Sequence, residues 1–366
     1  MMNEIFITRP ILPDLGELME LLEQSWDAAT LTNFGPHERN LTAQLQTYFD
    51  VDNLLLFNNG HMAIEAMLST LEPGGEVITT PFTFASTIHA ILNTGHTPVF
   101  VDVNDEDLGP DPDQVQQAIT PNTRAVLGVH VYGVPCDLAA LEAIGRDYNI
   151  RILYDAAHTF GVQHDGRSLV SYGDAAAVSF HATKVFNTVE GGCLSVNTDA
   201  IPLQRCKDFR NFGLTVDDVV SQSSNAKMSE VHAAVGLLNL KAVDAALKRR
   251  KIAASKYNAT LAEALEFTLL SPTSPNASYY PIIISGKQEN LADKRKRLIS
   301  HMAEKKVFSR PYFSPALHKT SYFSDFSKGR DYPRTSLLAD SVLCLPIHDS
   351  ITENELDRVC EALLSF

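Results

Sequence analysis

The first two thirds of the chain alternates short apolar runs with amphipathic stretches, and this alternation restricts the fold more than any other feature. NLLLF precedes HMAIEAMLSTL, EVITTP precedes FASTIHAILNTG, and RAVLGVHVYG precedes DLAALEAIGRDYN. Strands rich in Val, Ile and Leu, separated by helices of about ten residues, form right-handed β-α-β crossovers. The pattern therefore predicts an α/β protein whose mostly parallel central sheet is flanked by helices.

The pattern changes after a long stretch without proline. Residues 229–266 contain one glycine, and their apolar residues recur at helical spacing after Ser229, which can cap a helix. We expect one long helix here, or two that are nearly fused. Short strand patterns follow, and the chain ends with the amphipathic TENELDRVCEALLSF. We predict a large α/β domain at residues 1–240 and a smaller C-terminal α+β domain at residues 241–366.

Composition excludes several classes of protein. The 366 residues carry a formal charge of -14 without a long basic run, which argues against a nucleic-acid surface. No basic segment leads into an apolar one at the N-terminus, and no run has the length of a membrane span, so we expect a cytoplasmic protein. The five cysteines and twelve histidines lack the spacings of a disulfide framework or a zinc motif. No metal is assigned.

Lys184 occupies an unusual position, in a tight connection between the apolar runs DAAAVSF and GGCLSV. Asp155 ends another apolar run, ILYD, 29 positions earlier. The chain lacks the G-x-G-x-x-G of dinucleotide-binding proteins and the G-K-[ST] of nucleoside triphosphatases. A lysine and an aspartate at two strand ends suit a pyridoxal phosphate enzyme, in which the lysine bonds the cofactor and the aspartate pairs with the pyridine nitrogen.

Other residues at the expected strand ends suit the same cofactor. FNNGHMAIEAML predicts a strand, a turn at Gly60 and a helix whose first N–H groups can hold a phosphate. The Ser179 hydroxyl can contribute to the same phosphate site. Phe84 can cover one face of the cofactor ring, with Ala157 or His158 on the other face. Ligands of open α/β sheets bind at this carboxyl edge.

Each candidate also has an ordinary structural interpretation. A lone lysine is usually a solvated loop residue, and an aspartate that follows a strand can cap a helix. A histidine can stabilise a turn or lie in the core, an asparagine can belong to a helix cap, and aromatic residues are usually core. These alternatives apply to Lys184, Asp155, His158, His181, Asn225, Phe84 and the aromatic run at residues 279–281. The combination of Lys184, Asp155, Ser179 and the NNG turn favours the cofactor site.

Consecutive motifs along nearly the whole chain resemble the DegT-type sugar aminotransferases. These are fold-type-I pyridoxal phosphate enzymes that place an amino group on a nucleotide-linked keto sugar. The motifs include LTNFGPHERNLTAQL, FNNGHMAIEAM, TTPFTFAST, YDAAHTFGV, SFHATKVFNTVEGG and NAKMSEVHAAVGLLNL.

The resemblance implies a role for each matching position. Lys184 matches the lysine that bonds the cofactor, Asp155 the partner of the pyridine nitrogen, His158 the polar residue near the ring hydroxyl, and Ser179 the phosphate hydroxyl. Asn225 matches an asparagine that reaches the phosphate from the neighbouring subunit. A homodimer with shared active sites is therefore expected.

The resemblance also indicates residues for the substrate. Tyr312 and His318 match the segment that borders the sugar site, and His181 is a further candidate for substrate contact. Three cations, Arg210, Lys227 and Arg310, are available to a nucleotide diphosphate, and each could equally be a surface or capping residue.

One departure from the family pattern concerns the phosphate. Gly60, His61 and Met62 stand where most members have Gly-Thr-Ala, so the usual threonine hydroxyl is absent. Either the His61 ring supplies an N–H in its place or the backbone amides suffice.

The function implied is an aminotransferase that moves an amino group from L-glutamate to a nucleotide-linked keto sugar, in deoxysugar and O-antigen or polysaccharide biosynthesis. The motifs are most similar to members that convert dTDP-4-keto-6-deoxy-D-glucose to dTDP-4-amino-4,6-dideoxy-D-glucose. Members of a related subgroup have histidine at the lysine position and are dehydratases, and Lys184 argues against that subgroup. The alternatives are a 3-keto sugar or cyclitol aminotransferase, a lyase, or a non-catalytic regulator that binds pyridoxal phosphate.

Overall fold

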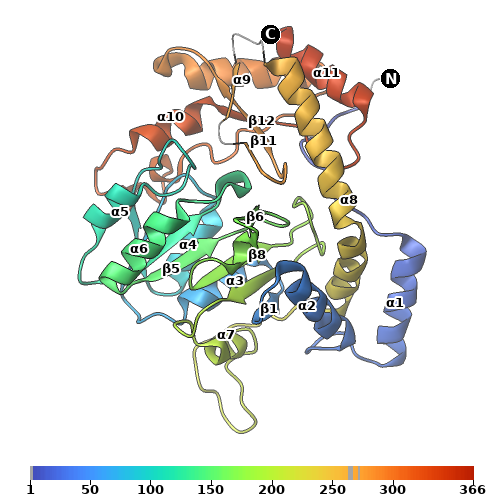
Figure 1. Cartoon of the computed structure of the whole chain (residues 1–366), viewed down its shortest axis with the longest axis vertical. Coiled ribbons are helices and arrows are strands. Elements are labelled where there is room, and N and C mark those ends of the chain that lie inside the picture. The colour runs from blue at the N-terminus through green and yellow to red at the C-terminus, as the bar shows by residue number, and fades with distance from the viewer. Residues whose placement is uncertain (1–2, 263–266, 271–272) are drawn as a thin grey trace.

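The computed structural model describes residues 3–262, 267–270 and 273–366. Helices and strands alternate through the first part of the chain, and the second part begins with a long helix (Figure 1). The elements of the first part are α1 (Leu15–Asp27), α2 (Pro36–Phe49), β1 (Leu54–Phe57), α3 (Gly60–Leu68), β2 (Glu76–Thr79), α4 (Ala85–Asn93), β3 (Thr97–Phe100), α5 (Pro112–Ala118), β4 (Thr123–Val129), α6 (Leu138–Tyr148), β5 (Arg151–Asp155), β6 (Gln163–His164), β7 (Arg167–Ser168), β8 (Ala175–Ser179), β9 (Gly192–Val196) and α7 (Leu203–Phe209). Those of the second part are α8 (Glu230–Leu261), β10 (Phe267–Leu269), β11 (Tyr280–Ile284), α9 (Gln288–Glu304), α10 (Pro333–Ser341), β12 (Val342–Leu345) and α11 (Glu353–Leu364).

The central sheet has seven strands in the order β1–β9–β8–β5–β4–β2–β3 within the described residues. Neighbouring strands from β8 to β3 are parallel, whereas β9 is antiparallel to both β1 and β8. The mostly parallel α/β sheet expected from the sequence is confirmed. Because β9 runs antiparallel to β8, the connection that carries Lys184 joins two neighbouring strands directly.

Different helices cover the two faces of this sheet. Side chains of one strand point alternately to opposite faces. On β5, Ile152 and Tyr154 join a buried cluster with residues of α2, α6 and α8, whereas Leu153 joins a second cluster with residues of α3, α4 and α7. Both faces of the strands are therefore buried, which explains their continuous apolar runs.

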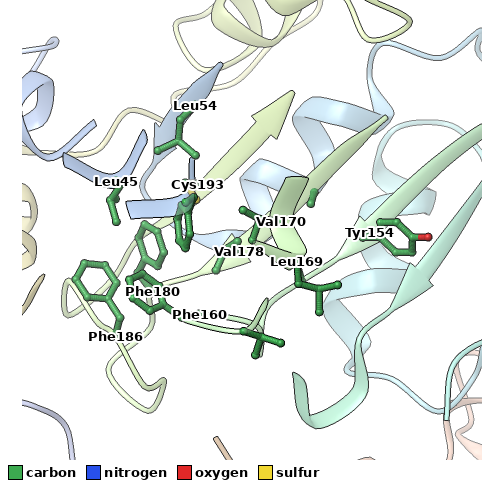
Figure 2. Packing of buried hydrophobic residues seen from close by; sticks show 14 of the residues in the cluster. Leu45, Leu54, Tyr154, Phe160, Leu169, Val170, Val178, Phe180, Phe186 and Cys193 are labelled. Atoms are coloured by element: carbon green, nitrogen blue, oxygen red, sulfur yellow. The ribbon is translucent and has the colours of Figure 1, made fainter. Parts of the chain in front are cut away.

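The connection from β8 to β9 is anchored by aromatic residues on either side of Lys184. Phe160, Phe180 and Phe186 lie close together in the first cluster (Figure 2). Phe186 stacks on Phe160 with ring centroids 4.4 Å apart and meets Phe180 edge to face at 4.9 Å. The Thr188 N–H donates to the Phe180 carbonyl at 3.0 Å, which closes the connection. Lys184 therefore projects from a loop whose two ends are fixed in the core.

Helix α8 is continuous through residue 240, as one of the two sequence interpretations expected. Ser229 is its N-cap, and the Ser229 side chain accepts a hydrogen bond from the His232 N–H. Residues 263–266 of the expected helix lie outside the described residues. The division of the chain into domains at residue 240 stays a prediction.

The second part of the chain contains the antiparallel sheet β10–β11–β12, which packs with α8, α9 and α11 around its own core. The start of the chain contributes to this core, since Ile5 is buried there and forms a parallel bridge with Val307. The Ile347 N–H also donates to the Ile7 carbonyl at 3.1 Å. No helix within the described residues is long and apolar enough to cross a membrane.

Candidate active site

A cavity of about 390 Å³ opens at the carboxyl edge of the central sheet. It brings together eleven residues that the sequence singled out: Gly60, His61, Phe84, Asp155, Ala157, His158, Ser179, His181, Lys184, Arg310 and Tyr312. Five other candidates, Met62, Arg210, Asn225, Lys227 and His318, are not among the described residues that line it. Parallel strands end at the same edge of a sheet, so residues far apart in sequence meet there.

Lys184 is partly buried in this cavity rather than solvated. Its Nζ donates a hydrogen bond to the Tyr279 hydroxyl at 3.3 Å, and that hydroxyl donates to Tyr312 at 3.1 Å. Burial lowers the pKa of Lys184 from 10.5 to about 8, the Asp155 carboxylate opposes this shift, and Arg310 adds to it. A large fraction of Lys184 is therefore a neutral amine near pH 8, as a nucleophile or general base requires.

Asp155 ends β5, and protein groups hold both of its carboxylate oxygens. The buried Thr87 hydroxyl donates to Oδ2 at 2.7 Å, and the Ala157 N–H donates to Oδ1 at 3.1 Å. Burial raises the pKa of Asp155, and the hydrogen bonds from Thr87 and Ala157, with the Lys184 charge, oppose this effect. A buried carboxylate that needs a positive partner is suited to a protonated pyridine nitrogen.

His158 is buried, and its environment determines which ring nitrogen carries the proton. The Tyr132 N–H donates to Nδ1 at 3.1 Å, so the neutral ring carries its proton on Nε2. Burial, together with Lys184, lowers the pKa of His158 well below its usual value. Its ring lies nearly parallel to that of Phe313, with centroids 5.9 Å apart. His158 is thus a fixed, uncharged hydrogen-bond donor at the cavity wall.

The start of helix α3 forms a cradle at one end of the cavity. Asn59 caps the helix by accepting the Met62 N–H at 2.8 Å, and the N–H groups of the first turn have no intrahelical acceptor. A Cβ at Gly60 would lie 2.9 Å from the Ser179 Cβ, closer than such atoms approach. Only glycine therefore lets the helix start approach β8, and this fits a site for a phosphate group.

His61 does not have a free ring N–H for a phosphate in this structure. Its Nδ1 is hydrogen-bonded to the Ser86 hydroxyl at 2.8 Å, and its Nε2 lies 2.9 Å from Glu65 Oε1. The replacement of the family's threonine hydroxyl by the His61 ring thus stays a prediction, and both ring nitrogens already have partners.

The remaining candidates lie away from the cavity or in other roles. Lys227 Nζ donates to Asn211 Oδ1 at 2.8 Å and to Asn225 Oδ1 at 3.0 Å. Asn225 is exposed, and because Ser229 caps α8 the helix-cap interpretation of Asn225 is wrong. His318 is buried, with Nε2 3.2 Å from the Ser336 hydroxyl.

Two further residues were interpreted from the sequence in more than one way. Phe84 precedes α4 and is 60% exposed, so the core interpretation of Phe84 is wrong for the single chain. Arg210, a candidate for the substrate diphosphate, is paired with Glu38 Oε1 at 3.1 Å and donates to the Leu56 carbonyl at 2.8 Å.

Within the part of the chain that the structure describes, no group of three or more His, Cys, Asp or Glu side chains is placed to hold a metal ion.

Sequence reasoning missed Tyr279 as a site residue. Tyr279 lies 95 positions from Lys184 in the aromatic run that was assigned to the core, and it is indeed buried. Its position beside Lys184 depends on how the second part of the chain packs over the sheet edge. A tyrosine next to a strand in the C-terminal part gave no local signal of that contact.

The fold and the cavity suit a pyridoxal phosphate-dependent aminotransferase, and comparison with known proteins gives the same class of protein. The chain belongs to the DegT/DnrJ/EryC1/StrS aminotransferase family, whose model matches residues 14–364. A dTDP-4-amino-4,6-dideoxy-D-glucose transaminase from Shigella dysenteriae is 36% identical over 368 residues, which cover 99% of this chain and 99% of that protein.

Two solved structures have the same architecture. DesI, crystallised in the presence of its TDP-sugar product, superposes with a TM-score of 0.90 at 31% identity and covers 100% of this chain and 93% of its own. NtdA from Bacillus subtilis, with bound cofactor PMP, gives a TM-score of 0.86 at 26% identity and covers 96% of this chain and 81% of its own.

Proposed function

We propose that this protein is a pyridoxal phosphate-dependent aminotransferase that moves an amino group from L-glutamate to a nucleotide-linked keto sugar. The preferred substrate is dTDP-4-keto-6-deoxy-D-glucose, and the product is dTDP-4-amino-4,6-dideoxy-D-glucose. The observation that carries the proposal is the arrangement of Lys184, Asp155 and the α3 cradle around one cavity. The names of the Shigella transaminase and of DesI with its TDP-sugar support the substrate class.

The residues of the cavity fit pyridoxal phosphate. The cradle formed by Gly60 and Ser179 suits the phosphate, Asp155 suits the pyridine nitrogen, and His158 offers Nε2–H to a ring oxygen. Phe84, exposed at the cavity wall, can cover one ring face. When bound, the cofactor supplies an electron sink and carries the amino group between donor and acceptor.

Lys184 is the residue that moves the proton in both halves of the reaction. Its Nζ is neutral above about pH 8 and could take the proton from the donor carbon in one half of the reaction and deliver a proton to the sugar carbon in the other. Tyr279 orients this amine through its hydrogen bond. The negative charge of Asp155 keeps a positive charge in the ring that faces it.

Arg310 is our candidate for the diphosphate of the substrate. It lines the cavity, and its guanidinium carbon lies 5.0 Å from the centre of the Tyr312 ring. Lys227 and Arg210 have acceptors within the chain, so Arg310 supports the proposal more directly. A local cation is needed because the chain carries a net charge of -14. The roles of His181, His318 and Lys227 toward the sugar stay predictions.

We also propose a homodimer in which Asn225 serves the partner's site. Asn225 is exposed and follows a segment with exposed apolar side chains, of which Val216 and Val219 are 98% and 62% exposed. Exposed apolar side chains that lie near one another in the sequence are a feature expected of a protein interface. The cytoplasmic location expected from the sequence remains a prediction.

Parallel assays of the two sugar ketones test the proposal. Purified protein with pyridoxal phosphate and L-glutamate is incubated with the dTDP-linked 4-keto sugar or with its 3-keto isomer, and the position of the new amine is read by NMR. We expect faster amination at C4. A faster 3-keto reaction would support the alternative sugar aminotransferase, turnover of a cyclitol ketone alone would support the cyclitol enzyme, and no turnover despite cofactor binding would support the regulator.

A further inference from the structure

Three side chains from two helices form a continuous hydrogen-bonded row beside the α3 cradle. Glu65 and His61 stand one turn apart on α3, and Ser86 lies in the first turn of α4. The distances are 2.9 Å from Glu65 Oε1 to His61 Nε2 and 2.8 Å from His61 Nδ1 to the Ser86 hydroxyl. Asn93 holds Glu65 Oε1 from the far side by donating at 2.7 Å.

The row ends at the cavity. His61 and Ser86 both line it, and Ser86 lies two residues after Phe84. Gly60, which forms the cradle, directly precedes His61. Ser86 therefore lines the same cavity as Gly60 and Ser179 of the cradle, and the buried Glu65 carboxylate holds the other nitrogen of the His61 ring.

The protonation state of His61 determines what Ser86 can offer. In the neutral ring with its proton on Nε2, directed at Glu65, Nδ1 is an acceptor and takes the Ser86 O–H. In the doubly protonated ring, Nδ1–H donates to the Ser86 oxygen, and the Ser86 O–H is free to donate elsewhere.

We propose that Ser86, held by the Glu65–His61 pair, donates its hydroxyl to the cofactor phosphate in place of the threonine that this chain lacks. The inference rests on the proposed function, because it assigns a residue toward the cofactor of that function. His61 then acts as a positioning residue that holds the Ser86 oxygen through Nδ1, and its ring does not itself bind the phosphate.

Binding of pyridoxamine phosphate to the cofactor-free full-length protein tests the proposal without turnover. Its Kd is measured by calorimetry and compared with that of pyridoxamine, which lacks the phosphate. A hydrogen bond to a charged group contributes about 1.5–3 kcal/mol, so Ser86→Ala should weaken pyridoxamine phosphate binding by about 10- to 100-fold. Pyridoxamine binding should change less than about twofold, because the lost contact is to the phosphate. Ser255→Ala, on the exposed face of α8, is the matched control.

Substitutions of His61 and Glu65 distinguish the role of the Ser86 hydroxyl from that of the two side chains that hold it. His61→Thr restores the hydroxyl that most family members have, so it should retain near wild-type affinity. In that background Ser86→Ala should cost less than about threefold, because the added threonine makes the phosphate contact. Glu65→Gln should weaken phosphate binding in the wild-type background and not in the His61→Thr background. Circular dichroism and thermal unfolding establish that each variant is folded.

The outcomes distinguish this inference from the proposed function. If the wild-type protein does not bind pyridoxamine phosphate, the proposed function fails. If the wild-type protein binds it and Ser86→Ala binds it equally well, only the present inference is overturned. Equal losses for pyridoxamine and pyridoxamine phosphate would also overturn it, since they would indicate a general distortion of the cavity.

Discussion

The carboxyl edge of the central sheet differs from the segment between α7 and α8. The difference is whether the side chains of each region have partners within the same chain. At the sheet edge, Lys184, Asp155 and His158 each have a hydrogen-bond partner within the chain. In the segment between the helices, Val216 and Val219 are largely exposed. The first region has partners for its polar groups within the chain, whereas the second leaves apolar side chains exposed.

The difference follows from the elements that build each region. Parallel strands end at one edge, so the sheet itself brings the catalytic candidates together, and the cores on both faces fix their backbones. The segment after α7 is a loop with bridges between Leu214 and Val219 and between Asn211 and Asn225. Its Val216 and Val219 side chains stay largely exposed, and Figure 1 shows the segment projecting away from the central sheet.

The largest effect expected concerns Lys184 at the sheet edge. Lys184→Ala should reduce amination at least about 10³-fold, because no other group takes over the proton transfer. Borohydride treatment of the protein with pyridoxal phosphate, followed by peptide mass spectrometry, should give a reduced adduct on the wild-type lysine and none on the variant. An adduct on the variant polypeptide would break the assignment of Lys184.

A mixing experiment addresses the other region. Asn225→Ala should weaken the cofactor complex by about 10- to 100-fold, as expected for a lost hydrogen bond to a charged group. When Lys184→Ala and Asn225→Ala chains are refolded together, each heterodimer has one site with both lesions and one with neither. At limiting cofactor, random pairing should restore about a quarter of the wild-type activity.

The contrast between the two regions would fail if the heterodimers, once shown to form, were as inactive as the two parent homodimers. That result would mean that Asn225 acts within its own chain. Recovery would instead establish that the exposed segment completes a site it does not line in its own chain.

The smallest effect expected is at Tyr279. Below pH 8 more of the Lys184 amine is protonated, so the rate should rise with pH and level above about pH 8. Tyr279→Phe removes the acceptor of the Lys184 hydrogen bond, which stabilises the charged amine, so this rise should move to lower pH. The lost orientation should reduce kcat by about tenfold or less. An unchanged pH profile would limit Tyr279 to a packing role, and Tyr280→Phe at the next position is the control.

The sequence predicted the sheet edge well because its signals are local. Apolar runs indicated the strands, and Lys184 and Asp155 follow directly from where two of those runs end. The NNG turn likewise predicted a helix start at Gly60, where α3 begins. Each of these inferences needed only a few neighbouring residues and the rule that ligands bind at the carboxyl edge.

The rest depended on packing between distant segments, which a single sequence does not specify. The contact of Tyr279 with Lys184 requires the second part of the chain to lie over the sheet edge. The engagement of His61 by Ser86 depends on how α3 and α4 lie against each other, and the sequence left open whether the His61 ring or the backbone amides serve the phosphate. The position of Asn225 toward a partner needs a second chain, so this prediction is still to be tested by the mixing experiment.

The bridge between Ile5 and Val307 has a consequence for how the protein is made. About 300 residues separate these two positions, and ribosomes add about 5–20 residues per second. The segment around Ile5 therefore waits on the order of 15–60 seconds for its partner, with an apolar side chain that is fully buried only at the end. When residue 307 is added, all strands of the central sheet have been made, as have β10 and β11, whereas β12 and α11 of the C-terminal core have not. Nascent chains arrested before residue 307 should accordingly expose the Ile5 segment to chaperones or to proteolysis.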